Sequence, residues 1–164
     1  MHPLPPHPQP PLPATLVEAT PMTRMTTAPP ASTKGLPRPA AALALCIALT
    51  VRALPTRHRM RARITLARAT RFLPPSPGDR VVRAYAAVTA RQPSWWPGQI
   101  DCKERALATV LATALTGRSC HLVLGARTLP AAFHAWAVAA DGTPAGADEA
   151  GGTDHPWTPV HTTR

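Results

Sequence analysis

The sequence predicts an α+β protein in which a group of helices comes first and a small antiparallel sheet follows. Three observations predict this order. Apolar side chains recur at helical spacing between residues 39 and 115. From residue 120 onward the apolar residues alternate with others, as in half-buried strands. The Asp141-Gly142 pair then gives the sharpest hairpin signal in the chain, which implies antiparallel pairing.

The N-terminal part of the chain is rich in proline. More than half of the 22 prolines precede residue 40. Proline lacks a backbone N–H and holds φ near one value, so such a stretch builds neither helix interiors nor central strands. We therefore predict a disordered tail over residues 1–38, whose function, or whose origin in a mis-assigned start, stays open. A helical subdomain over 39–91 and a core over 92–164 are expected to follow.

Three helices are predicted before residue 92. The first, residues 39–54, is apolar and ends before Pro55; its run of apolar residues is too short to span a bilayer, so no membrane partner is expected. The second, residues 56–73, is rich in arginine. The third covers residues 79–91, with Asp79 as its N-cap.

A fourth helix has the clearest boundaries. Asp101 stands at the N-cap position and Glu104 three residues later, which is an aspartate variant of the capping box. Gly117 closes the helix as a C-terminal glycine does. The first helical residue is then Cys102. Unpaired amides and partial positive charge at a helix start lower the pKa of a thiol there.

The C-terminal third is predicted to form strands. Residues 120–125 and 133–140 alternate in the manner of strands, and a return strand should follow the hairpin turn over residues 143–149. Proline and glycine in that return segment restrict it to a sheet edge. The segment that ends with residues 155–160 is expected to be a last short strand or a tail.

A thiol, an imidazole and an acid follow one another in this layout. Cys102 begins a helix, His134 lies mid-strand, and a cysteine peptidase needs a third group to orient the imidazole. Asp141 lies about 20 Å along the strand from His134 at ~3.3 Å per residue, so it is a turn residue. Folding the hairpin about Asp141-Gly142 places a position near 149 opposite His134, so that Asp148 and Glu149 both return within reach of the imidazole. We predict Asp148 as the orienting acid, with Glu149 as the alternative after a one-residue slip. The Cys-bearing helix would thus pack on a sheet that carries the His and Asp.

Charge and cysteine content limit the function classes. The net charge is +10, and the excess lies in the first hundred residues, above all in 52–71. Such a run could bind phosphates or an acidic protein partner, or it could form the solvated face of a helix. Because aromatic residues do not alternate with the arginines, we expect no nucleic-acid partner. Three cysteines without a CxxC pair argue against a disulfide framework and a structural zinc site, and favour a reducing, cytoplasmic location. Cys46 and Cys120 are expected in the core.

Four segments resemble a known family. They are residues 102–108 (CKERALA), 122–127 (LVLGAR), 133–136 (FHAW) and the Asp-Gly turn. Together they resemble the transglutaminase-like leader peptidases of lasso-peptide clusters, the B proteins, in their C-terminal catalytic half. The resemblance extends over residues 39–160. It implies a transglutaminase- or papain-like core.

The resemblance also implies a function. Cys102 would be the nucleophile, His134 the general base and acid, and Asp148 the third residue of a cysteine endopeptidase. The substrate would be the leader region of a ribosomally made precursor peptide. A separate leader-binding protein would present it, and a lactam-forming synthetase would act in the same maturation. Departures from the family pattern, such as Phe133 before the histidine, keep two alternatives open: acyl transfer to an amine, or a non-catalytic basic scaffold.

The oxyanion donors and cofactors are the remaining expectations. The backbone amide of Cys102 is one candidate donor, and Gln99 or Trp96 in the preceding loop is a candidate for the second. Cys120 and His121 are adjacent on a strand and face opposite sides, so they are poor co-ligands of a metal. We expect no cofactor and no metal.

Overall fold

The computed structural model describes residues 38–91, 93, 95–128, 131–148 and 156–163. The predicted proline-rich tail, apart from its last residue, lies outside the described residues. So does Glu149, the alternative orienting acid.

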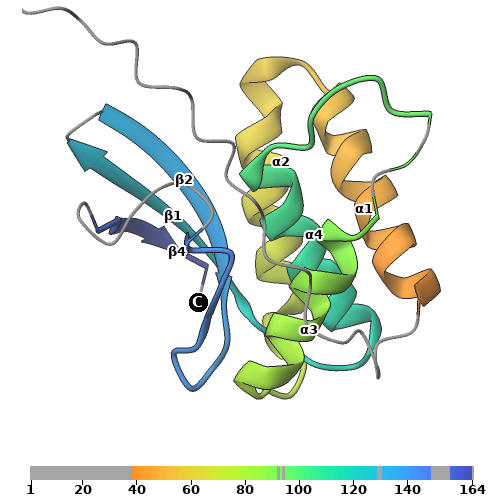
Figure 1. Cartoon of the computed structure of the whole chain (residues 1–164), viewed down its shortest axis with the longest axis vertical. Helices are drawn as coiled ribbons and strands as arrows, with labels where there is room; N and C mark the ends of the chain where they lie inside the picture. Colours follow the sequence, from red (N-terminus) through yellow and green to blue (C-terminus); the bar gives the residue numbers. More distant parts are fainter. Residues whose placement is uncertain (1–37, 92, 94, 129–130, 149–155, 164) are drawn as a thin grey trace, which may run out of the picture.

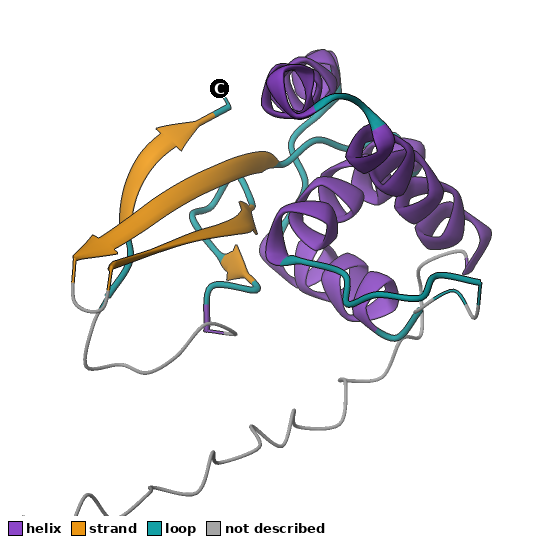
Figure 2. Ribbon diagram, turned by 90° about the horizontal axis from the view of Figure 1, so that it is seen from above, coloured by secondary structure: helices purple, strands orange, loops and turns teal. Residues whose placement is uncertain are grey.

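The predicted α+β architecture is confirmed. The helices lie on one side of a small sheet (Figure 1), and the view from above separates the two layers clearly (Figure 2). The helical elements, in chain order, are α1 (Arg38–Ala53), α2 (Thr56–Ala69), η1 (Thr70–Phe72), α3 (Gly78–Thr89) and α4 (Cys102–Leu115). One hydrophobic cluster joins side chains from the helices and the strands. The segments predicted on either side of residue 91 therefore share a core, and the boundary itself stays a prediction.

Helix α1 buries an apolar stripe. Ala41, Leu45, Ala48 and Leu49 recur at three- and four-residue spacing and are all buried. Cys46 lies off this stripe and is exposed, so its predicted core position is wrong. None of the helices in the described ranges has the length and hydropathy that a membrane-spanning helix requires.

Helix α3 begins one residue earlier than predicted. Pro77 holds the N-cap position and Gly78 is the first helical residue. Asp79 is therefore not the cap. Its carboxylate instead pairs with Arg83, one turn further along the helix, at 2.6 Å.

Helix α4 lies at the centre of the helical layer (Figure 1). It packs against α1, α3 and β2, and its middle residues, from Ala106 to Val110, are fully buried. Asp101 does occupy the N-cap position, but its side chain makes no capping hydrogen bond. Glu104 is buried in an ion pair with Arg63, so the predicted capping box does not form. Gly117 has a φ of 77°, which confirms the glycine ending of this helix.

The sheet has four antiparallel strands in the order β3-β2-β1-β4. They are β1 (His121–Thr128), β2 (Ala131–Val138), β3 (Pro144–Ala145) and β4 (Thr158–Thr162). Leu122, Ala135 and Ala137 join the core shared with the helices. Because successive side chains on a strand point to opposite faces, Trp136 and Val138 lie on the face away from that core.

The return strand is much shorter than predicted. Ala137 pairs with Ala145 and Val138 with Pro144, after which the strand ends. Continuing this register by three residues on each strand would place Asp148 opposite His134. The chain leaves the strand first, because Gly146 adopts a φ of 86°.

Candidate active site

Cys102 is the first residue of α4 and is partly buried. The extended backbone of Asp101 brings the chain to the helix start, where the first amides have no partner within the helix. The side chain packs against the shared core on one side. A thiol in this position combines partial solvent access with the positive end of a helix, as reactive cysteines do.

The surroundings of Cys102 lower its thiol pKa. Burial acts in the opposite direction and is the largest single influence. It is outweighed by hydrogen bonds from the His134 side chain and the Ala135 backbone, together with the positive charges of His134 and Lys103. The strand β3 pairs with β2 only at residues 137 and 138, which leaves the backbone at Ala135 open to the sulfur. The structure thus brings Cys102 and His134, 32 positions apart, into hydrogen-bonding contact.

A hydrogen bond from the Nε2 of the imidazole to the backbone holds His134 in place. Its Nε2 lies 2.7 Å from the carbonyl oxygen of Gly146. A carbonyl only accepts, so Nε2 carries the proton and donates it. This leaves Nδ1 for the thiol of Cys102. The tautomer that can take a proton from sulfur is therefore selected by a backbone group.

Gly146 reaches the imidazole because of its own conformation. Its φ of 86° turns the chain out of β3 and directs the carbonyl toward His134. A side chain at this position would also collide with α3, because a Cβ would lie 2.5 Å from the ring of Tyr85. Sequence reasoning missed this residue, since a glycine in a predicted edge strand signals only a weak strand.

Two tryptophans cover the imidazole. The ring of Trp136 stacks near it at a centroid distance of 5.9 Å, and the ring of Trp157 lies at 5.1 Å. The guanidinium of Arg127 lies 4.6 Å from the Trp157 ring centroid. His134 is only 3% exposed as a result. Solvent therefore has little access to the imidazole.

The predicted acids occupy different places. Asp141 lies at the turn, where its carboxylate accepts hydrogen bonds from the backbone N–H groups of Thr143 and Gly78 at 2.9 Å each. These bonds lower the Asp141 pKa. Asp148 is exposed, two residues beyond Gly146. The Nε2 of the imidazole lies against the carbonyl of Gly146. The role of Asp148 as the orienting acid stays a prediction.

The candidate oxyanion donors lie just before α4. The Nε1 of Trp96 is buried and has no hydrogen-bond partner among the described residues. The backbone carbonyl of Gln99 accepts a hydrogen bond from Arg52 at 3.4 Å. A buried indole N–H without a partner is free to donate to an incoming oxygen.

Two further titratable side chains at the sheet are used structurally. Burial raises the pKa of Cys120 to about 11, so its thiol stays protonated. The Nδ1 of His121 lies 2.6 Å from the carbonyl oxygen of Thr163. No group of three or more potential metal ligands gathers within the part of the chain that the structure describes.

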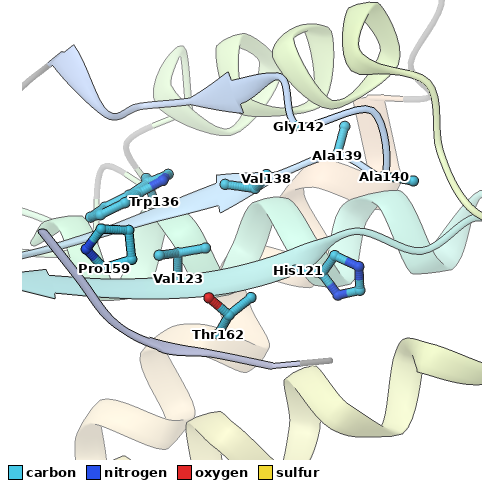
Figure 3. A pocket seen from close by; sticks show the side chains of 9 residues that line it. All are labelled: His121, Val123, Trp136, Val138, Ala139, Ala140, Gly142, Pro159 and Thr162. Atoms are coloured by element: carbon cyan, nitrogen blue, oxygen red, sulfur yellow. The ribbon is translucent and has the colours of Figure 1, made fainter. Parts of the chain in front are cut away.

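A hollow of about 310 Å³ opens on the outer face of the sheet. Figure 3 shows the side chains that line it, among them Val123, Val138 and Trp136 from β1 and β2, and Thr162 from β4. Neither Cys102 nor His134 is part of the lining. Trp136 belongs both to the hollow and to the cover over the imidazole.

Comparison with known proteins gives one result. Residues 24–160 match the family described as the transglutaminase-like superfamily. Searches of curated proteins and of solved structures each returned no significant match. The family match spans all four α-helices, the first three strands and three of the five residues of β4.

Proposed function

Because the chain belongs to the transglutaminase-like superfamily, we propose that it is a cysteine peptidase that removes the leader from a lasso-peptide precursor. The observation that carries the catalytic part of this proposal is the contact between Cys102 at the start of α4 and His134 on β2. A thiol paired with an imidazole that is itself held by a third group is the arrangement of an activated cysteine nucleophile.

The chemistry follows from this contact. The Nδ1 of His134 takes the thiol proton, and the thiolate of Cys102 attacks the carbonyl carbon of the scissile peptide bond. The oxygen of that carbonyl becomes an oxyanion, for which the N–H of Cys102 and the Nε1 of Trp96 are the proposed donors. As the C–N bond breaks, the imidazolium gives its proton to the leaving amine. A thioester remains on Cys102, and water hydrolyses it to free the acid and the thiol.

The orienting group is proposed to come from the segment that follows the hairpin turn. Two groups in it are candidates: the carbonyl of Gly146, which is bonded to Nε2, and the carboxylate of Asp148, which the sequence predicts. Either fixes the tautomer, but only the carboxylate also stabilises an imidazolium by its charge.

The substrate is proposed from the resemblance of the segments at 102–108, 122–127 and 133–136 to lasso-peptide leader peptidases. The scissile bond would join leader and core in a ribosomally made precursor. A separate leader-binding protein would present the precursor. A lactam-forming synthetase would then close the ring on the new N-terminus.

Helix α2 is the proposed surface for a protein partner. Four exposed arginines lie along one stripe of α2 and η1, and none of them pairs with a carboxylate among the described residues; they are Arg57, Arg61, Arg68 and Arg71. Phe72 at the end of the stripe is 80% exposed. Arginine and exposed aromatic side chains are the residue types that protein interfaces favour. An acidic segment of the leader-binding protein would complement the stripe.

Acyl transfer is the second candidate reaction. The thioester on Cys102 reacts with an amine as readily in principle as with water, and the covered imidazole supports this alternative because it limits water at the site. The product distinguishes the two: hydrolysis leaves a free carboxylate on the leader, whereas transfer leaves an amide.

The test of the proposal is leader release. The protein is incubated with its precursor and the leader-binding partner, and the products are weighed by mass spectrometry. Cleavage is expected for the parent and its loss for Cys102→Ala and His134→Gln. A non-catalytic scaffold would bind the precursor without changing its mass. Unchanged cleavage by Cys102→Ala would falsify the catalytic assignment.

A further inference from the structure

Arg52 from α1 touches the chain on both sides of Cys102. Its Nη1 lies 2.9 Å from the carboxylate of Asp101 and 3.4 Å from the backbone carbonyl of Gln99. The same nitrogen lies 3.6 Å from Oε2 of Glu104 in the first turn of α4. The guanidinium also lies over the ring of Trp96, 5.6 Å from its centroid.

Glu104 makes this contact more than a surface ion pair. Its side chain is 1% exposed, and its Oε1 is hydrogen bonded to the buried guanidinium of Arg63 on α2. Its Oε2 makes no hydrogen bond among the described residues, so Arg52 is the cation that faces this oxygen. A buried carboxylate that loses a cation partner carries a large desolvation penalty. Two arginines, one from each N-terminal helix, therefore hold the first turn of α4 in place.

We propose that Arg52 is a positioning residue, which ties the loop before α4 and the first turn of α4 to α1 and so sets the place of the Cys102 thiol. The proposal rests on the proposed function, in which Cys102 is the nucleophile. Arg52 acts through Asp101, Gln99 and Glu104 and is not one of the groups whose interactions shift the Cys102 pKa.

Position and charge make different predictions for this cluster. The charged groups near the start of α4 are Asp101 at the N-cap, Lys103 and Glu104 in the first turn, Arg52 on α1 and His134 on β2. If only charge mattered, Arg52→Lys would behave as the parent, and Asp101→Asn would make the thiolate easier to form. If Arg52 positions the thiol, both variants loosen the helix start and weaken the hydrogen bonds from His134 and Ala135.

The experiment measures the alkylation of Cys102 by iodoacetamide as a function of pH. Cys46 is exposed, so it is replaced by serine throughout, whereas Cys120 is buried and stays protonated. Arg52→Gln, Arg52→Lys and Asp101→Asn are compared with Arg83→Gln, which breaks the exposed pair with Asp79 on α3. Circular dichroism melting shows that each variant is folded. The readout needs no substrate, so it is independent of peptidase activity.

We expect the alkylation rate at pH 6.5 to fall about tenfold in Arg52→Gln, which corresponds to one unit in the thiol pKa. Arg52→Lys and Asp101→Asn should each fall at least about threefold, a shift of half a unit on the same scale, and Arg83→Gln should match the parent. An alkylation rate in Arg52→Lys equal to that of the parent, or a faster alkylation in Asp101→Asn, would overturn the proposal in favour of a charge effect. If the parent thiol is activated but none of the three variants changes its alkylation rate, the positioning role is overturned and the proposed function is not. An ordinary thiol in the parent would refute the proposed function as well.

Discussion

The ring of Tyr85 on α3 lies 2.5 Å from the point where a Cβ on Gly146 would stand. The same glycine has a φ of 86° and offers its carbonyl to Nε2 of His134 at 2.7 Å. A helix of the N-terminal layer therefore decides which residue can stand beside the imidazole. Any side chain at position 146 has to displace either Tyr85 or the carbonyl.

Replacing Gly146 by alanine should lower both stability and thiol reactivity. The positive φ alone costs an L-residue about 1–2 kcal/mol, and the collision with Tyr85 adds about 1–3 kcal/mol of overpacking. Gly142→Ala is the matched control, because Gly142 has a φ of 87° but no atom lies within 4 Å of the point where its Cβ would stand. Chemical denaturation should give a larger loss for Gly146→Ala than for Gly142→Ala. Equal losses of unfolding free energy would mean that the Tyr85 side chain moves aside at no cost and that its contact with position 146 does not affect stability.

The reactivity of Cys102 should extend to lower pH than that of a free cysteine. Hydrogen bonds from His134 and Ala135 lower its pKa, so the thiolate persists below the ordinary value of about 8.5 and is lost only as the pH falls through the lowered pKa. In His134→Gln the charge of the imidazolium is removed, so the profile should move to higher pH. Iodoacetamide alkylation in the Cys46→Ser background, followed by intact mass, measures both profiles. Coincident profiles for parent and variant would show that the imidazole does not activate the sulfur.

Asp148→Asn separates the two candidates for the orienting group. Since Nε2 already has an acceptor in Gly146, we expect leader release to fall less than about tenfold, whereas His134→Gln should lose at least a hundredfold of the rate, as removal of a general base does. Glu149→Gln is measured beside it as the neighbouring acid. A loss of a hundredfold or more in Asp148→Asn would instead assign the orienting role to that carboxylate, as the sequence predicts.

Trp157 should matter for the rate of catalysis more than for substrate binding. Its ring lies 5.1 Å from the imidazole of His134 and excludes water from that side. Trp157→Ala exposes the imidazole of His134 to water, so kcat should fall about tenfold with little change in KM. Trp157→Phe should recover most of the lost kcat. Leu43→Ala, which removes an exposed apolar side chain from α1, serves as the control. A change confined to KM would show that Trp157 contacts the substrate and does not shield the imidazole.

Local sequence patterns were sufficient to predict most of the secondary structure. The apolar stripe of α1, the glycine ending of α4 at Gly117 and the Asp-Gly turn at residue 141 each depend on neighbours within a few positions, so they can be recognised in the sequence. The pairing of Cys102 with His134 was also predictable, because a helix start and a mid-strand position each constrain one side chain. The contacts of Arg52 were not predicted, although it is a charged residue in the last turn of a mostly apolar helix.

The contacts that complete the site arise from packing between distant segments. Asp79 and Glu104 have the sequence spacing of capping residues, yet they pair with Arg83 and Arg63, and no side chain caps α3 or α4. The return strand ends at Ala145 because Gly146 takes a left-handed conformation against Tyr85. The sequence by itself thus determined the fold class through local periodicity, and it predicted that Cys102 and His134 would meet. Only the tertiary structure decided that a backbone carbonyl meets the imidazole and that Arg52 of α1 contacts Asp101 and Gln99 just before α4, because both depend on distances between segments that no local pattern encodes.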